Sequence, residues 1–183
     1  VVNEYMPRAR DTVGLWDTPN GEARYAELAR FYTTTNLTPD EIHEIGLKEV
    51  ARIQEEMLKV IAKTGFKGSF EEFLTYLRTD PKFFYKTSPE LLEGYRSVAK
   101  RIDPELIKIS RKLPRTPYGV IQIPDALAPM SPTAFANGGA PDGSRPAYFF
   151  ANLYKPETRP KWEMMALTLH EAMPGHCLQI SVA

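Results

Sequence analysis

Apolar residues recur at helical spacing through the first part of the chain. A first helix is predicted by four of them at positions i, i+3, i+4 and i+7, namely Tyr25, Leu28, Ala29 and Tyr32. A second, long helix is expected from about Pro39 to Lys63, because Thr38 and Glu41 have the spacing of a capping box and Gly65 is placed to end it. Its apolar stripe, expected to be buried, consists of Ile42, Ile45, Val50, Ile53, Met57, Val60 and Ile61.

Three shorter helices are predicted at about 70–77, 89–102 and 104–112. The last two would begin at Ser88-Pro89 and Asp103-Pro104, since proline is well suited to the first turn of a helix. Residues 1–113 are therefore expected to be helical.

The second part of the chain is too rich in proline for long helices, because ten of the 16 prolines lie between residues 114 and 174. We expect loops and a small sheet at 114–160, with strands at 118–123 and 147–153 and turn-forming residues at 137–143. A final helix should begin near residues 160–162 and direct three apolar side chains inward, those of Met165, Ala166 and Leu169. The sequence thus predicts one mainly helical α+β segment over 1–183, with 161–183 as its last helix.

Composition and charge exclude several classes of protein. The 183 residues contain 23 basic and 23 acidic side chains, and the interleaved signs argue against a nucleic-acid surface. The single cysteine, Cys177, excludes an internal disulfide framework and any multi-cysteine metal site. No stretch is long and apolar enough for a membrane span, and the first residues do not resemble a signal peptide. The chain starts without Met and stops in apolar sequence, which suggests part of a larger domain; composition leaves its oligomeric state open.

Two of the three histidines lie close together near the end of the chain, at His170 and His176. His170-Glu171 resembles the start of the zinc-peptidase helix motif, in which histidines at i and i+4 bind Zn²⁺ and the intervening glutamate is the general base. Here Pro174 occupies i+4 and the second histidine is at i+6, roughly 240° around an unbroken helix.

Pro174 and Gly175 leave two interpretations open. The proline cannot donate a hydrogen bond to the carbonyl of His170, so the helix could bulge and turn His176 back toward His170. Alternatively, Pro-Gly simply ends the helix, and both histidines are surface or packing residues. The first interpretation predicts a metal site, because a costly break beside His and Glu is typical of a functional position.

Two stretches resemble the bacterial family named domain of unknown function 885. One is residues 33–53, and the other combines 142–149 with the run from His170 to Gln179. The latter is similar to the family signature of His-Glu, two variable residues, Pro-Gly-His and a Gln three positions later. The resemblance covers about residues 25–183. It implies a distant relationship to zinc peptidases, and members that are often longer and exported or lipid-anchored.

The resemblance also implies roles for individual residues. His170 and His176 would be metal ligands for zinc, and Glu171 would be the base that activates a metal-bound water. Family members usually carry a later Glu-Gly-Trp motif for a third ligand, and nothing like it follows His176 here. Cys177 stands where the family often has another histidine; we interpret it as a small buried residue, with a thiolate ligand as the alternative.

The strand at 147–153 precedes the motif, where zinc peptidases of this general class keep an edge strand that pairs with an extended peptide. The resemblance implies substrate binding there by strand addition, with Tyr148 on that strand and Asn152 as a polar clamp. The alternative is an interior strand whose aromatic residues fill the core. Arg145 could bind a substrate carboxylate, although a loop arginine is also compatible with simple solvation.

These observations lead to two functional hypotheses. The first is a zinc-dependent hydrolase that acts on peptide-like substrates through His170, Glu171 and His176. The second is a non-catalytic helical binding protein, or an inactive fragment that lacks the third ligand. An exposed apolar groove on the long helix, with the two histidines pointing apart, would favour the second hypothesis.

Overall fold

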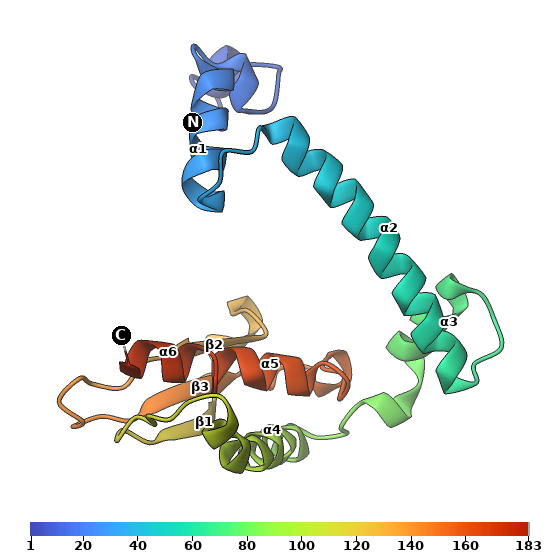
Figure 1. Ribbon diagram of the computed structural model, residues 1–183, viewed down its shortest axis with the longest axis vertical. Coiled ribbons are helices and arrows are strands. Elements are labelled where there is room, and N and C mark those ends of the chain that lie inside the picture. Colours follow the sequence, from blue (N-terminus) through green and yellow to red (C-terminus); the bar gives the residue numbers. More distant parts are fainter. Residues whose placement is uncertain (183) are drawn as a thin grey trace. The chain divides into compact units, whose positions relative to one another are not determined.

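The computed structural model describes residues 1–182 and divides into two compact units, Val1–Phe70 and the residues from Glu71 onward (Figure 1). The described elements are α1 (Gly21–Thr33), α2 (Pro39–Thr64), α3 (Phe70–Thr79), α4 (Ser88–Ile102), β1 (Tyr118–Gln122), β2 (Ala134–Asn137), β3 (Ala147–Ala151), α5 (Met164–Glu171) and α6 (His176–Val182). Helices predominate over one small mixed sheet, so the predicted mainly helical α+β class is confirmed. Within residues 1–182 no helix is long and apolar enough to cross a membrane.

The local signals for α2 act as predicted. The Thr38 hydroxyl accepts from the backbone N–H of Glu41, whose carboxylate accepts in return from the N–H of Thr38 at 2.8 Å. Gly65 ends the helix in the left-handed region, at φ 75°, which glycine adopts without steric cost.

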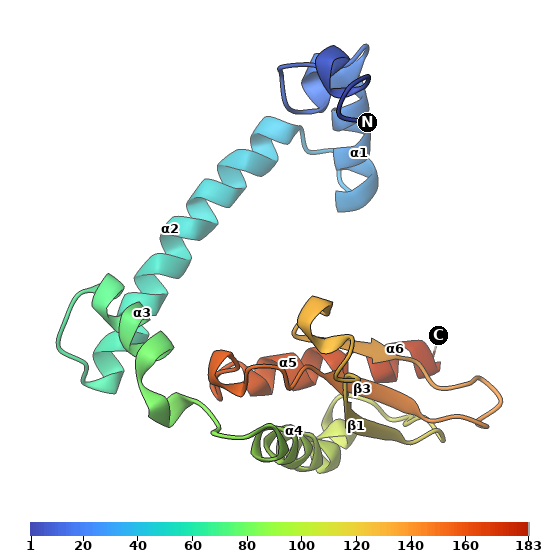
Figure 2. The same cartoon turned by 180° about the vertical axis from the view of Figure 1, so that it is seen from behind.

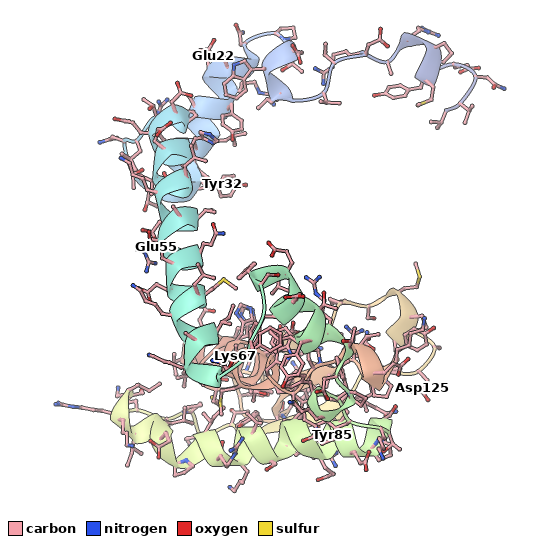
Figure 3. The ribbon with its side chains drawn as sticks, turned by 90° about the vertical axis from the view of Figure 1, so that its right-hand side faces the viewer. Glu22, Tyr32, Glu55, Lys67, Tyr85 and Asp125 are labelled. Atoms are coloured by element: carbon pink, nitrogen blue, oxygen red, sulfur yellow. The ribbon has the colours of Figure 1, made fainter. Side chains whose placement is uncertain are left out.

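The expected burial of the α2 stripe is wrong. Only Ile61 is buried, and most of the other stripe residues are exposed. The same holds for the apolar face of α1, from which the side chain of Tyr32 projects (Figure 3). Between α1 and α2 lies an open apolar groove lined by Tyr25, Leu28, Ala29, Tyr32, Thr33, Pro39 and Ile42. Capping therefore determines where these helices begin and end, whereas their apolar faces stay largely exposed; Trp16 packs on Tyr25 of α1, with ring centroids 4.6 Å apart.

The second unit contains the sheet, in the order β1-β3-β2. β1 pairs with β3 in parallel, with Val120 opposite Phe149, and β2 pairs antiparallel, with Phe135 opposite Phe150. The predicted strands at 118–123 and 147–153 are confirmed, but β2 was missed. Because β3 has a partner on each side, the expectation that 147–153 is an edge strand is wrong, and the interior-strand alternative is correct.

One face of β3 forms the core under the helices (Figure 2). Ala147, Phe149 and Ala151 are fully buried, whereas the alternate residues are only half-buried, as the two-residue period of a strand requires. Phe149 packs edge to face on Tyr95 of α4, with ring centroids 5.3 Å apart. α4 packs against β1 and α5, while α6 contacts β2 and β3, so the motif helices lie on a sheet with a well-packed inner face.

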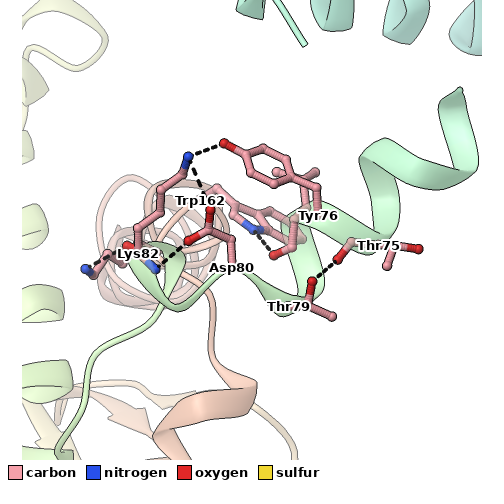
Figure 4. A network of polar contacts seen from close by, with 8 residues as sticks. Thr75, Tyr76, Thr79, Asp80, Lys82 and Trp162 are labelled. Carbon is pink, nitrogen blue, oxygen red and sulfur yellow. Dashed lines mark hydrogen bonds and ion pairs between the residues drawn. The ribbon is translucent and has the colours of Figure 1, made fainter. Parts of the chain in front are cut away.

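The end of α3 and the residues that follow it contact the chain just before the motif helix (Figure 4). The Nε1–H of Trp162 donates to the carbonyl of Leu77 at 3.5 Å, and the N–H of Lys161 donates to the carbonyl of Phe83 at 2.7 Å. Lys82 is hydrogen-bonded to the hydroxyl of Tyr76 and paired with Asp80. Residues 76–83 therefore fix the chain just before α5.

Two predicted helices differ from the structure. The helix expected at 104–112 is only a short 3-10 turn, Asp103–Lys108, in which Leu106 is the one buried side chain; Ile107 and Ile109 are exposed, so packing does not support a longer helix. In α5, Met165, Ala166 and Leu169 are exposed rather than inward, because the helix packs through Met164, Thr168 and Glu171.

Candidate metal centre

The motif helix is broken between its two histidines. α5 ends at Glu171 and α6 begins at His176, and the four residues between them are not helical. The break has its own hydrogen bonds, since the N–H of Cys177 donates to the carbonyl of Ala172 at 3.1 Å. Pro174, which has no N–H, lies inside it. The 240° separation of an unbroken helix therefore does not apply.

The break brings the two imidazoles together. The ring centroids of His170 and His176 are 4.7 Å apart and their planes are nearly perpendicular, at 82°. His170 is exposed and His176 is half-buried. Both line an open hollow of about 500 Å³, together with Leu169, Pro174, Gly175 and Gln179. The break therefore turns His176 back toward His170, as in the first of the two interpretations of the sequence.

Gly175 makes this close approach possible. A Cβ atom built on Gly175 would lie 1.8 Å from the carbonyl oxygen of His170 and 2.4 Å from its carbon. Both are backbone atoms, so no side-chain movement could relieve the overlap. Glycine is thus required here by the contact between the end of α5 and the residue that precedes α6.

Glu171 lies between the histidines in sequence, and its side chain is 93% buried, with 7% of its surface exposed. Its Oε2 atom has no hydrogen-bond partner, and neither does the Oγ1 atom of Thr168, one turn earlier. A buried carboxylate without a partner is costly, and such groups are concentrated at functional sites. The unpartnered Oε2 atom of Glu171 is the second unusual feature of the motif, after the paired imidazoles.

The paired imidazoles fit two of the ligands of a zinc ion. With Zn–N bonds of about 2.0–2.1 Å and tetrahedral angles, two coordinating imidazoles have centroids about 5 Å apart, close to the 4.7 Å between His170 and His176. Among residues 1–182, however, no group of three or more His, Cys, Asp or Glu side chains is placed to hold a metal. The described residues thus supply two imidazoles and no third ligand.

Cys177 follows His176 but is fully buried. Burial raises the pKa of its thiol to about 11, with a further contribution from the negative charge of Glu171. The thiol is therefore neutral at physiological pH and behaves as a small packing group, in line with the interpretation made from the sequence.

We expect Cys177 to be unreactive in the folded protein. A thiol whose pKa is about 11 and whose side chain is fully buried should react with 5,5′-dithiobis(2-nitrobenzoic acid) at pH 8 roughly 100-fold more slowly than in denaturant. Because folding raises the pKa, its contribution to stability is complete below about pH 9 and is lost as the pH rises toward 11. Comparable labelling rates in the folded and denatured protein would contradict this assignment.

Asn152 has a structural role in place of the polar clamp expected from the sequence. The residue is fully buried, and its Nδ2 lies 2.8 Å from the carbonyl oxygen of Ala128 and 3.0 Å from that of Pro132. Its Oδ1 accepts from the N–H of Tyr154 at 3.0 Å. The side chain ties the end of β3 to the loop before β2 and has no free group to offer a substrate.

Replacement of Asn152 by alanine should therefore lower the free energy of unfolding by about 2–4 kcal/mol, because several buried carbonyl groups lose their donor. Urea denaturation followed by circular dichroism measures this change. Asn137→Ala is the matched control, since Asn137 is exposed at the end of β2, and its effect should stay within about 0.5 kcal/mol. Equal effects of the two substitutions would overturn the structural role of Asn152.

The other two residues predicted to bind substrate are not brought to the histidines by any described contact. Tyr148 is half-buried on the face of β3 opposite that of Phe149, and its ring lies over Gly119. Arg145 is exposed, and its Nη1 donates to the carbonyl of Gly138 at 2.9 Å, closing the loop before β3.

Two surfaces beside the motif were missed in the sequence. β2 has a free edge, since no described strand pairs with its other side, and it contacts both α5 and α6. The exposed face of α5 is apolar. The alternation around Phe135 could have revealed the strand, whereas the face of α5 could not be assigned without knowing which side packs on α4.

Comparisons with known proteins identify the chain at the level of its family. The crystal structure of a "putative lipoprotein from Colwellia psychrerythraea" superposes with a TM-score of 0.88 at 30% sequence identity. The match covers 98% of this chain and 32% of that one, so this chain spans about a third of the length of that relative. No curated protein matches the chain. The model of the family described as bacterial protein of unknown function, DUF885, matches residues 1–183, and the chain belongs to this family.

Proposed function

We propose that this chain carries part of the active site of a zinc-dependent hydrolase that acts on peptide or amide bonds. The observation that carries the proposal is the pair of imidazoles 4.7 Å apart. Glu171 follows His170 in sequence and has a buried carboxylate oxygen without a partner, although it is not among the residues that line the histidine hollow. His170 and His176 would hold the ion, and Glu171 would accept a proton from the attacking water and later donate it to the leaving nitrogen. Zinc bound there would lower the pKa of that water and polarise the substrate carbonyl.

A third protein ligand would have to come from outside residues 1–182. The relative of known structure is about three times as long as this chain, which leaves room for such a ligand in a longer family member. Catalytic zinc sites commonly have three protein ligands and one open position. On this proposal, the second unit supplies two ligands and the base.

An extended peptide is the proposed substrate class. Its support is the free edge of β2, a strand that also contacts the two helices that carry the histidines. An unpaired strand edge offers backbone N–H and C=O groups to an extended chain. The central position of β3 rules out the strand originally expected to have this role.

The proposal is tested by zinc content, measured by elemental mass spectrometry after zinc loading and gel filtration. In a longer chain that also contains the third ligand, we expect about one zinc per molecule and a loss in His170→Ala of roughly tenfold or more in affinity. His43→Ala is the matched control, because His43 is the remaining histidine and lies exposed on α2. Zinc retained equally by both variants, with no hydrolysis in a broad peptide panel, would refute the proposed function.

A non-catalytic binding protein is the second candidate. The observation that favours it is the open apolar groove between α1 and α2, next to a long helix whose apolar side chains are largely exposed. The convergence of the two imidazoles argues against it, because the binding hypothesis expected them to point apart.

A further inference from the structure

The motif helix carries an exposed apolar stripe that its packing does not use. Trp162, Met165 and Leu169 follow one another at intervals of three and four residues, and 47%, 42% and 37% of their respective surfaces are exposed. Ala166 lies between them and is also exposed. This spacing places Met165, Ala166 and Leu169 on one side of α5. Trp162 lies two residues before the helix, in a turn that leads into it through the hydrogen bond from the N–H of Met164 to the carbonyl of Lys161 at 3.3 Å. We refer to these four residues as the α5 stripe.

The α5 stripe connects two hollows. At one end, Leu169 lines the hollow of about 500 Å³ that contains both histidines. At the other end, Trp162 lines a second hollow of about 360 Å³ that also includes Leu77, Phe84 and Pro160. The indole of Trp162 is oriented by its hydrogen bond to the carbonyl of Leu77 (Figure 4). An apolar surface thus continues from the candidate metal centre to a pocket that is lined by the hydrogen-bonded indole of Trp162.

The charges around the second hollow do not select an ionic group. Arg78, Glu157 and Glu163 line it together, so both signs are present. The part that can discriminate among ligands is the apolar one, formed by the indole of Trp162 and its neighbours. Large apolar and aromatic side chains gain most from such a surface.

The length of the α5 stripe defines how far the side chain bound at Trp162 lies from the bond that reacts at the histidines. Trp162 and Leu169 are seven positions apart, and most of this span belongs to α5, so a helical rise of 1.5 Å per residue gives a length of about 10 Å. An extended peptide rises by about 3.3 Å per residue, so it covers this length in about three residues. A peptide held at the histidines would therefore place a side chain at Trp162 about three positions from the bond that reacts.

We propose that the α5 stripe is a specificity surface, which binds a large apolar or aromatic side chain about three residues from the scissile bond of an extended peptide. This inference rests on the proposed function, because it takes the histidine hollow as the reaction centre. Continuity through Leu169, which belongs to both the stripe and that hollow, is what selects a peptide substrate as the occupant.

Tryptophan fluorescence tests the proposal without requiring catalysis. The chain has two tryptophans, so Trp16→Phe leaves Trp162 as the only indole. The probes are two capped heptapeptides that are identical except for Phe or Gln three positions from the central bond, on either side of it. We expect the Phe peptide to shift the emission of Trp162 and to bind roughly tenfold more tightly than the Gln peptide. Equal binding, or no shift with either peptide, would overturn the proposal.

Cleavage profiling provides the second test, and it tests the specificity surface separately from the proposed hydrolase activity. The zinc-loaded protein is incubated with a peptide library, and the cleaved bonds are mapped by mass spectrometry. We expect enrichment of large apolar residues three positions from the bond, and a loss of roughly fivefold or more of that enrichment in Met165→Gln. Met130→Gln is the matched control, because Met130 is 93% exposed and lies outside the α5 stripe.

The outcomes distinguish the stripe from the proposed reaction. Cleavage without that preference, or a preference unchanged in Met165→Gln, refutes the specificity surface but leaves the hydrolase intact. Absence of cleavage together with absence of zinc refutes the hydrolase, and the fluorescence titration then shows whether a peptide still binds. Trp162 emission that acrylamide cannot quench in the peptide-free protein would mean that another part of the molecule covers the α5 stripe, which also overturns the proposal.

Discussion

Replacing Gly175 by alanine should lower the affinity for zinc by roughly 100-fold, a loss comparable to removal of a ligand-supporting residue. The added Cβ would lie 1.8 Å from the carbonyl oxygen of His170, so the chain before α6 must move away from the end of α5. That movement separates His176 from His170, whose rings are now 4.7 Å apart. Competition with a chromophoric chelator measures the change in zinc affinity.

Gly46→Ala is the matched control for this substitution. Gly46 lies inside α2, and a Cβ built there meets no atom within 4 Å. The control should bind zinc normally and gain about 0.5–1 kcal/mol of stability, because alanine favours a helix interior. Zinc affinity equal to wild type in a folded Gly175→Ala variant would contradict the role assigned to the glycine. Circular dichroism of the metal-free variant establishes that it is folded.

Local sequence rules predicted the helices well, because capping depends on residues that are close in the chain. The Thr38 box and Gly65 bound α2 as expected. α4 begins at Ser88, as the Ser88-Pro89 pair suggested, and its capping residue is Thr87, with Glu90 completing the box.

Burial could not be predicted by the same rules, since it depends on what packs against each face. The stripe of α2 has good helical period, yet Ile61 is its one buried member. In α5 the period allowed either side to face inward, and contact with α4 and the sheet selected Met164 and Thr168 over Met165. β2 was missed because only four residues form it and its partner β3 lies after a long loop.

The candidate site was predictable in its chemistry and only partly in its geometry. His170, Glu171 and His176 stand out from their types and spacing, and Pro174 with Gly175 indicated that the helix would break. The close approach of Gly175 to the carbonyl of His170 could not be derived from spacing, because it depends on the path of the four residues between the helices. The role imagined for Asn152 failed for a related reason, since its buried partners are 20 or more residues away in sequence.

Glu171→Gln should lower kcat for peptide hydrolysis by roughly 10³-fold, if the carboxylate is the general base. Glutamine keeps the shape of the side chain but cannot accept the proton of the attacking water. Zinc content should remain at the wild-type value, because the proposed ligands are the two imidazoles. Steady-state hydrolysis of a quenched fluorescent peptide and elemental analysis of the same samples measure both quantities.

The same substitution should make the metal-free protein more stable, and this separates a catalytic role from a structural one. Oε2 of Glu171 is buried and has no partner, so a neutral amide in its place avoids the cost of an unpaired buried carboxylate. We expect the free energy of unfolding to rise by about 1–2 kcal/mol. A structural carboxylate would behave in the opposite way, because its replacement would lower both stability and activity. A less stable Glu171→Gln variant that still hydrolyses peptide at the wild-type rate would therefore exclude Glu171 as the base. An increase in stability together with a loss of turnover would establish that the protein retains this carboxylate for its chemistry.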